Sequence, residues 1–374
     1  MTGVLTVDRL RRNQGHRCSA FSLDWGFGAE CGLVPVALSR HGKVLMEKTT
    51  ISLIPPPPEW PTLLSRVFEE EGYSYGFDIK DDTADEGLER ADALIGGRLK
   101  QGQIEKAAKL KFLQVPFAGI DKIDLRSLGQ RGVTVANAHE NALSVAEHGM
   151  LLLLSLAKNL VNQDRDLRKG MWHGWVAVEP NPEVYGKTLG IIGIGRIGFE
   201  MARRAKCLGM RVIGTKAHPE KGREKLTEAV DEIRPMDEFD AVIGKSDFLF
   251  VSVPLATSTK GLIGKRELQM MKGKYLINVS RGEVVDEEAL YLALKEGQLK
   301  GAGIDAWYIY PREGTFAFPS RYPFHELSNV IMTPHSAGYT FESQLRNWEF
   351  SFRNITRFFR DGSAQNILPL DPGE

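Results

Sequence analysis

The sequence predicts an α/β protein in two domains, the larger of them built on a doubly wound parallel sheet, and three observations support this. Short apolar strands alternate with helix-patterned segments from residue 49 onward. A glycine-rich turn joins one of these strands to a helix near the middle of the chain. At 374 residues, the chain is long enough to form two domains, each with its own core.

Composition favours a small-molecule partner. Lys plus Arg equals Asp plus Glu, at 48 each, so no global charge attracts nucleic acid or an anionic membrane. The three cysteines, Cys18, Cys31 and Cys207, lack metal-ligand or CxxC spacing, so we expect no metal site and a reduced intracellular chain. The most apolar run, residues 150–157, is too short to cross a bilayer. We therefore expect a cytoplasmic protein.

The first part of the chain is predicted to hold an extension followed by a small α/β domain. Residues 1–45 mix arginines with acids, show no clear periodicity and lack the apolar core of a signal peptide, so we expect a poorly ordered extension. Residues 46–143 then alternate strands and helices. The strands are expected at 49–53, 93–95, 112–115 and 133–135, and the helices at 60–71, 103–110 and 123–130.

The second domain is predicted over residues 144–337. It is expected to begin with one long amphipathic helix over 144–167 and to continue in doubly wound style. Its six expected strands are 188–192, 211–215, 247–253, 274–278, 301–306 and 330–333. A last helix, 341–361, carries aromatic residues on one side and is expected to return to the first domain. That domain would then be discontinuous, as residues 46–143 and 338–374.

The glycine-rich turn predicts a dinucleotide site. Gly193, Gly195 and Gly198 form a G-x-G-x-x-G pattern that follows a buried strand and opens directly into a helix. Gly193 allows a tight turn, Gly195 lets the backbone approach a pyrophosphate, and Gly198 lets the helix pack closely on its strand. The helix N-terminus adds free N–H groups and a positive dipole. Alone, the pattern is also compatible with an ordinary glycine-rich turn.

Three other strands are followed by residues that carry chemistry. Arg281 follows the expected strand 274–278, Asp305 ends the next, and His335 follows the last. Because the carboxyl ends of parallel strands meet at one edge of a sheet, these side chains can converge on one cleft.

These residues resemble the D-isomer-specific 2-hydroxyacid dehydrogenase family, which includes glyoxylate/hydroxypyruvate reductases, phosphoglycerate dehydrogenases and formate dehydrogenases. The resemblance runs from about Thr49 to Asp361 and is carried by the glycine turn and by the runs 278–286, 333–335, 117–121 and 145–148. It implies a Rossmann NAD(P)-binding domain over 144–337 and a smaller flavodoxin-like substrate domain. It also implies hydride transfer between NAD(P)H and a small 2-oxo acid, such as glyoxylate or hydroxypyruvate, and a homodimer.

The resemblance assigns the reacting groups. Arg281 is implied to bind the substrate carboxylate and polarise the carbonyl, a task suited to a permanently charged guanidinium fork. His335 is implied to protonate the carbonyl oxygen as hydride arrives. The backbone N–H groups of Ala118 and Gly119 are expected to meet the substrate carboxylate as well.

Further positions are implied to contact substrate or cofactor. Arg98 matches a substrate-binding arginine of the phosphoglycerate dehydrogenases, although a solvated surface charge explains it equally well. Asn141 matches a substrate-contacting asparagine of the formate dehydrogenases, with a helix cap as the alternative. The residues implied to hold the cofactor are Gly193, Gly195, Arg196, Ile197, Gly198, Thr215, Lys216, His218, Val253, Pro254, Val279, Ser280, Asp305 and Gly338.

One departure from the family pattern concerns the cofactor. An NAD-preferring site carries an acid about 20 residues past the glycines, where it bonds the ribose 2′-hydroxyl. Here Lys216 occupies that position beside Thr215, with Lys221 and Arg223 near by. A cation with a neighbouring hydroxyl suits a 2′-phosphate, so we favour NADP over NAD. The alternative is that Lys216 points to solvent and either cofactor serves.

The other departure concerns the partner of His335. The family usually places a glutamate where this chain has Tyr310. A neutral phenol cannot stabilise imidazolium as a carboxylate does, so we expect easier deprotonation of His335 and reduction favoured at mildly acidic pH. Glu313 or Glu326 are alternative partners. The missing acid also leaves open formate oxidation, or a non-catalytic NAD(P)H-sensing protein resembling the corepressors with this fold.

Overall fold

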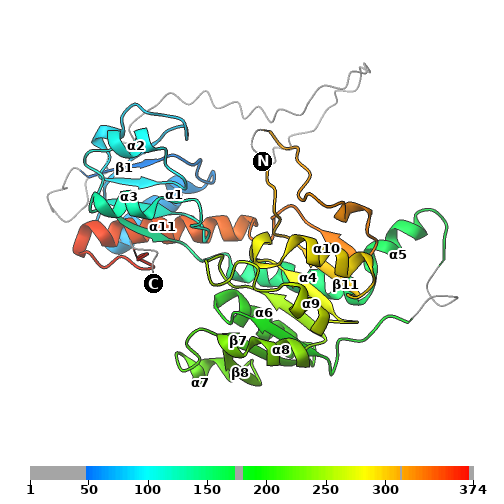
Figure 1. Cartoon of the computed structure of the whole chain (residues 1–374). Coiled ribbons are helices and arrows are strands. Elements are labelled where there is room, and N and C mark those ends of the chain that lie inside the picture. Colours follow the sequence, from blue (N-terminus) through cyan, green and yellow to red (C-terminus); the bar gives the residue numbers. More distant parts are fainter. Residues whose placement is uncertain (1–47, 173–179, 312–313, 370–374) are drawn as a thin grey trace, which may run out of the picture. The chain divides into compact units, whose positions relative to one another are not determined.

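The computed structural model describes residues 48–172, 180–311 and 314–369 (Figure 1). The expected extension over residues 1–45 lies outside the described residues. Within the described ranges, no helix is long and apolar enough to cross a membrane. No group of three or more His, Cys, Asp or Glu residues suited to a metal ion occurs in the same ranges.

A five-stranded sheet forms the first part of the fold. All its strands are parallel and lie in the order β2-β1-β3-β4-β5, which is the flavodoxin-like order. The strands are β1 (Thr49–Ser52), β2 (Gly76–Ile79), β3 (Ala93–Ile95), β4 (Phe112–Val115) and β5 (Thr134–Asn137). The sequence prediction missed β2, which is a short edge strand containing Gly76 and Asp78 and therefore shows little of the apolar pattern of a central strand.

Helices cover both faces of this sheet. Because neighbouring residues of a strand point to opposite faces, they join different cores. Phe112 joins an apolar core with α1 (Trp60–Glu71) and α11 (Phe341–Asp361). Leu113, the next residue, joins a second core with α2 (Gln101–Lys106) and α3 (Leu125–Gln130). A short 3₁₀ turn, η1 (Leu88–Arg90), closes the second core.

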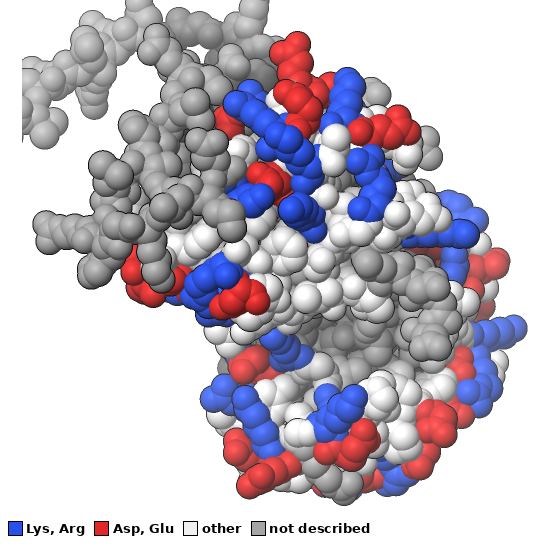
Figure 2. Space-filling view, turned by 90° about the vertical axis from the view of Figure 1, so that its left-hand side faces the viewer, with Lys and Arg blue, Asp and Glu red and all other residues white. Residues whose placement is uncertain are grey.

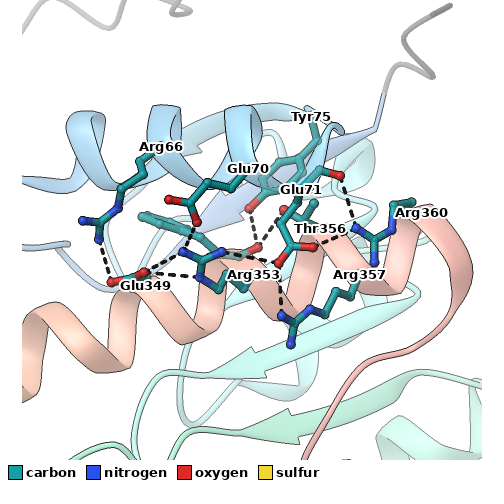
Figure 3. A network of polar contacts seen from close by, with 10 residues as sticks. Arg66, Glu70, Glu71, Tyr75, Glu349, Arg353, Thr356, Arg357 and Arg360 are labelled. Carbon is teal, nitrogen blue, oxygen red and sulfur yellow. Dashed lines mark hydrogen bonds and ion pairs between the residues drawn. The ribbon is translucent and has the colours of Figure 1, made fainter.

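Ion pairs fasten α11 to α1 along their exposed edge (Figure 3). Glu71, at the end of α1, lies 3.1 Å from Arg357 and 2.7 Å from Arg360. Arg353 lies 2.8 Å from Glu349 on its own helix and 3.4 Å from Glu71. The final helix is therefore joined to the first helix by charge as well as by its aromatic face.

A seven-stranded parallel sheet forms the second part, in the order β12-β11-β10-β9-β6-β7-β8. From β6 the strands are added toward one edge of the sheet as far as β8, and β9 to β12 are then added on the other side of β6, as in a Rossmann fold. The predicted doubly wound α/β class is therefore confirmed. Its strands are β6 (Thr188–Ile192), β7 (Arg211–Lys216), β8 (Glu232–Pro235), β9 (Phe248–Val251), β10 (Tyr275–Asn278), β11 (Gly301–Ile304) and β12 (Val330–Met332). The prediction of six strands was wrong because β8 is a half-buried edge strand that carries charge and ends in Pro235.

Helices again lie on both faces of this sheet (Figure 1). One apolar core holds α4 (Ala142–Ala157) and α6 (Arg196–Cys207) against the sheet. The opposite core holds α8 (Phe239–Lys245), α9 (Lys265–Met270) and α10 (Glu287–Lys295). The remaining elements are short: α7 (Arg223–Leu226), η2 (Met236–Glu238), η3 (Gly282–Val284) and η4 (Phe324–Glu326).

The single helix expected over 144–167 is in fact two helices. α4 ends at Ala157, and α5 (Leu160–Leu167) begins after Asn159, whose φ of 52° lies in the left-handed region. Asn tolerates this conformation better than most residues, and a left-handed residue ends a helix. The apolar spacing continues through Leu160 and Val161, so periodicity alone did not reveal the break.

Candidate functional site

The glycine turn after β6 has the shape that a pyrophosphate requires. Gly193 has a φ of 95°, and a Cβ there would press on the backbone N of Val253 at 3.1 Å. A Cβ on Gly198 would lie 2.5 Å from the carbonyl oxygen of Gly193, so only glycine allows α6 to start this close. At Gly195 no described atom lies within 4 Å of a Cβ position, which leaves the backbone open on that side.

The start of α6 supplies the donors for an anion. The first N–H groups of a helix have no partner within the helix, and the dipole makes this end positive. The side chain of Arg196 turns away to Glu140, with Nη1 2.8 Å from Oε1. The open backbone at Gly195 and the helix start therefore fit a dinucleotide pyrophosphate.

Lys216, the last residue of β7, lies against the glycine turn. Its Nζ donates to the carbonyl oxygen of Ile194 at 3.1 Å, so the alternative of a side chain directed only to solvent is wrong. Thr215 supports the same turn, because its Oγ1 accepts the Gly193 N–H at 3.3 Å. His218 is exposed and lies 3.6 Å from Glu220.

Other residues implied to hold the cofactor also lie at the carboxyl ends of strands. Val253 follows β9 and Val279 follows β10, and both side chains are buried, whereas Pro254 is exposed. Ile197 is half-buried in the first turn of α6, and the side chain of Arg223 lies outside what the structure describes. Strand ends therefore bring most of the implied cofactor set to one edge of the seven-stranded sheet.

A polar turn after β10 presents Arg281. The Asn278 side chain accepts from the N–H and hydroxyl of Ser280, at 3.0 and 2.8 Å, and donates to the carbonyl oxygen of Arg281 at 2.9 Å. Asn278 and Ser280 are almost fully buried, so this loop has little freedom. The guanidinium Nη1 then donates back to the Ser280 carbonyl at 2.9 Å.

Asp121 is a further partner of Arg281. Its Oδ1 accepts from Nε at 3.1 Å and from Nη2 at 3.0 Å. Burial opposes ionisation of Asp121, but the charge and hydrogen bonds of Arg281 outweigh it and hold the pKa of the carboxyl below its ordinary value. A guanidinium carries five N–H groups, and these contacts with Asp121 and Ser280 engage three of them. Two N–H groups therefore remain for a ligand.

The turn Ala118–Gly119, after β4, lies beside the same guanidinium. A Cβ on Gly119 would collide with Nη2 of Arg281, so glycine is what lets the two approach. The Ala118 carbonyl accepts from Nδ2 of Asn137 at 2.9 Å, which fixes the turn. Within the described ranges, neither the Ala118 N–H nor the Gly119 N–H donates to a protein acceptor. Charge and free N–H groups thus coincide, as an anion site requires.

Asp305 anchors the loop that carries His335. Its buried carboxylate accepts from the Thr333 hydroxyl at 2.6 Å and from the N–H groups of Ser336 and Ala337, each at 3.0 Å. His148 extends the network, with Nε2 2.9 Å from the Thr333 hydroxyl. His335 itself has a φ of 57°, a left-handed conformation that this loop must hold.

Tyr310 takes the place of the expected acid beside His335. Its Oη lies 2.6 Å from Nδ1 of the imidazole. The surrounding protein partly desolvates the His335 ring, although one side of the residue meets solvent. This desolvation and the charge of Arg281 lower the pKa of His335, while Asp305 and Asp121 act in the opposite direction. The direction agrees with the sequence prediction, but the causes are burial and Arg281, whereas the prediction named the neutral phenol. Burial also raises the pKa of the Tyr310 phenol, which stays neutral.

The other predicted positions differ in how far the structure supports them. Asn141 precedes α4, but its side chain makes no capping hydrogen bond, and its Nδ2 instead lies where a Cβ on Gly338 would fall. Arg98 follows β3 and is exposed, as a surface charge would be. Glu326 is exposed and makes no contact with the imidazole in the described part of the chain, and Glu313 lies outside it.

Sequence reasoning missed the contributions of Asp121 and Thr333. Both lie inside the quoted runs 117–121 and 333–335, so a signal was present, but it did not say which residue they contact. Asp121 meets a residue 160 positions away, and Thr333 meets Asp305 28 positions away. Only the path of the strands brings these pairs together.

Comparison with known proteins places the chain in a family. Residues 150–337 match the family model for the NAD-binding domain of D-isomer specific 2-hydroxyacid dehydrogenases. A glyoxylate reductase from Pyrococcus furiosus is 35% identical over 308 residues, which cover 80% of this chain and 88% of that relative. A D-3-phosphoglycerate dehydrogenase from Methanocaldococcus jannaschii is also 35% identical, over 292 residues that cover 76% of this chain.

The chain spans about half the length of the phosphoglycerate dehydrogenase, since the match covers 53% of it. Among solved structures, an acyclic imino acid reductase in complex with NADPH and D-Arg is 27% identical, with a TM-score of 0.70 over 86% of this chain and all of that one. The family model covers half of this chain, and its residues include the glycine turn, Arg281, Asp305 and His335. The chain belongs to the D-isomer specific 2-hydroxyacid dehydrogenase family.

Proposed function

We propose that this chain reduces a small 2-oxo acid to the corresponding D-2-hydroxy acid, with NADPH preferred over NADH. The observation that carries the proposal is the Arg281 guanidinium beside the free N–H groups of Ala118 and Gly119. His335 follows β12 in the same sheet whose strand β10 precedes Arg281. Guanidinium and backbone N–H groups together select a carboxylate. The names of the glyoxylate reductase relatives support a small substrate.

Each residue then has a definite task. The two remaining N–H groups of Arg281 bind the substrate carboxylate and polarise the adjacent carbonyl oxygen. His335 donates a proton to that oxygen as it gains negative charge. The nicotinamide cofactor supplies the hydride when it is bound, held by the glycine turn and the start of α6. Closure of the site around the substrate excludes water from the transfer.

The preference for NADPH rests on Lys216. Its ammonium lies at the glycine turn, bonded to the Ile194 carbonyl, where an NAD-preferring site places an acid. A cation at this point attracts a 2′-phosphate, and the absence of a carboxylate removes the usual acceptor for the ribose hydroxyl. The neighbouring imino acid reductase was crystallised with NADPH, which agrees with this preference on the same fold.

We also propose a homodimer formed through α4, α5 and the residues up to Trp172. Large apolar side chains are exposed along these elements, among them Leu151, Leu160, Leu167 and Trp172, and Trp172 is 77% exposed. A monomer rarely leaves so many apolar groups in water along one stretch. Sedimentation equilibrium of the full chain tests this, and a monomer at micromolar concentration would contradict it.

A small-molecule partner also fits the surface charge. On the face drawn in Figure 2, basic and acidic side chains lie next to each other. With 48 residues of each sign in the chain, the field that nucleic acid requires does not build up.

The test is consumption of NADPH and NADH by the purified full chain with a panel of 2-oxo acids, at pH 6 and pH 8, beside reduction of NADP⁺ and NAD⁺ with formate. We expect NADPH loss that depends on the oxo acid and is faster at pH 6. Arg281→Ala should lower kcat/KM by about 10³-fold or more, because it removes both carboxylate binding and carbonyl polarisation.

Arg266→Ala is the matched control. Arg266 is exposed on α9, pairs with Asp240 of α8 and has no place in the proposed site. It should keep the wild-type rate. Activity with formate alone would transfer the proposal to formate oxidation. Tight NADPH binding without turnover of any substrate would favour a sensing protein instead.

A further inference from the structure

The phenol of Tyr310 is held between two polar groups. Its Oη accepts the backbone N–H of Trp307 at 3.1 Å and lies 2.6 Å from Nδ1 of His335. Within the described ranges these are its two hydrogen-bond partners. A phenol has one proton and accepts through its oxygen lone pairs, so the Trp307 N–H fixes one acceptor position.

This arrangement favours one tautomer of the imidazole. In the neutral ring, a bare Nδ1 would give the Tyr310 hydroxyl proton its acceptor, and the ring proton would then lie on Nε2. With the ring charged, Nδ1–H would donate to Oη, and the phenol proton would lose its acceptor within the described part of the protein. A carboxylate at the same place would instead accept Nδ1–H and stabilise the charge.

The pair is fixed by its surroundings. The Trp307 side chain is buried, and its Nε1 donates to the Thr333 carbonyl at 2.8 Å. That carbonyl begins the loop that Asp305 holds through Thr333, Ser336 and Ala337. The Trp307 side chain thus joins the segment that carries Tyr310 to the loop that carries His335. This connection holds the Tyr310 hydroxyl and Nδ1 of His335 at their separation of 2.6 Å.

Four charged groups act on the imidazole of His335. Arg281 and Lys122 oppose its protonation, and the Lys122 ammonium lies 5.6 Å from the centre of the Tyr310 ring. Asp305 and Asp121 favour protonation, but Asp305 is engaged by three donors and Asp121 by Arg281. None of these carboxylates bonds to a ring nitrogen of His335, and His148 faces Thr333 and Asp305 instead.

We propose that Tyr310 is a positioning residue that holds His335 as the neutral imidazole with its proton on Nε2 and so confines the proton-donating imidazolium to acidic pH. For catalysis this rests on the proposed function, because a pH limit matters only if His335 donates to a substrate. The Nε2–H group of the neutral ring still orients a carbonyl oxygen by a hydrogen bond. Transfer of a full proton draws on the charged ring.

The tautomer is measured first, without turnover. Nitrogen chemical shifts of histidine-labelled, cofactor-free protein give the protonation of Nδ1 and Nε2, and loss of a signal in His335→Asn assigns it. We expect bare Nδ1 and protonated Nε2 in the wild type at pH 8. Tyr310→Phe should mix the tautomers, and Tyr310→Glu should move the proton to Nδ1.

The pH dependence of reduction is measured next, in an isosteric pair. Tyr310→Glu and Tyr310→Gln differ in charge and not in size. We expect the pH above which kcat/KM falls to be higher in Tyr310→Glu than in Tyr310→Gln by about one unit or more. The reason is that a carboxylate next to the His335 ring favours the imidazolium form. At pH 8, that shift corresponds to a kcat/KM about tenfold higher in Tyr310→Glu than in Tyr310→Gln. Tyr308→Phe is the control, since its hydroxyl bonds to Val285 and not to His335.

Two results would overturn the proposal: a proton on Nδ1 in the neutral wild-type ring, or the same pH limit in the Glu and Gln variants. Circular dichroism and NADPH binding establish that each variant is folded. If the wild type turns over no 2-oxo acid, the proposed function fails, and the nitrogen shifts still decide what Tyr310 does to the ring.

Discussion

Replacement of Asp305 by Asn tests whether this residue holds the His335 loop or serves the cofactor. The carboxylate accepts one hydroxyl and two backbone N–H groups, from Thr333, Ser336 and Ala337, and is 1% exposed. Asparagine offers one acceptor oxygen, and its NH₂ group must face an N–H of the loop, so at least one bond is lost and one buried donor is left unsatisfied. Each such loss costs about 1 to 3 kcal/mol.

We therefore expect Asp305→Asn to lower the free energy of unfolding by about 2 to 3 kcal/mol and Tm by about 5 to 10 °C, for a domain of this size. Asp305→Ala removes all three acceptor contacts and should cost about 4 to 6 kcal/mol. Thr333→Val, the matched variant, loses the hydroxyl contacts with Asp305 and His148 and should cost about 1 to 2 kcal/mol. Thr333→Val leaves the two backbone N–H groups bonded to Asp305, Asp305→Asn leaves at least one donor unsatisfied, and Asp305→Ala leaves all three without their acceptor.

Guanidinium denaturation of the three variants measures these losses, and NADPH titration measures the cofactor Kd. If Asp305 anchors the loop, stability falls in the order Thr333→Val, Asp305→Asn, Asp305→Ala, while the Kd of the folded protein changes less than about tenfold. If Asp305→Asn leaves the unfolding free energy unchanged and raises the NADPH Kd by more than about tenfold, the anchoring argument is refuted. Direct contact of Asp305 with the nicotinamide would then be favoured.

Three further predictions concern the cofactor site and the ion pairs between α1 and α11. Lys216→Asp should lower the ratio of kcat/KM for NADPH to kcat/KM for NADH by about 10²-fold, because the substitution replaces a cation with the acid that bonds a ribose hydroxyl. Steady-state kinetics with both cofactors measures this ratio. Gly198→Ala places a Cβ 2.5 Å from the Gly193 carbonyl and should cost about 1 to 3 kcal/mol in stability and weaken NADPH binding in calorimetry; unchanged binding would contradict the close approach. Burial raises the pKa of Glu71, but Arg360 and Arg357 outweigh this and hold it below its ordinary 4.5, so the stability it adds is present above pH 4.5 and lost as the pH falls further. Glu71→Gln should accordingly lower Tm at pH 7 and leave it unchanged near pH 2, and an equal loss at both values would show that charge is not the cause.

Part of the fold was accessible from sequence because the signals were local. The strands 93–95, 112–115 and 188–192 and the helices 60–71 and 341–361 were predicted with the bounds that the structure shows. Each is a central strand or a strongly amphipathic helix, in which burial and periodicity agree. The edge strands β2 and β8 were missed, because an edge strand buries little and its sequence carries no apolar pattern.

The break between α4 and α5 was missed for a different reason. Leu160 and Val161 continue the apolar spacing of α4, yet they are exposed in the structure, at 53% and 50%. A pattern of apolar residues does not by itself show that one straight helix buries them all. The left-handed Asn159 decided the outcome, and its effect depends on the backbone path.

The sequence by itself determined the glycine turn and the positions of Arg281, Asp305 and His335 at strand ends, because parallel strands place their carboxyl ends at one edge whatever the loops do. It also identified the unusual residues Lys216 and Tyr310. Only the tertiary structure decided what they touch. Lys216 meets the Ile194 carbonyl across 22 positions, and Tyr310 meets His335 across 25. Such contacts depend on the paths of turns and loops, which follow from the packing of the whole sheet and not from any local pattern.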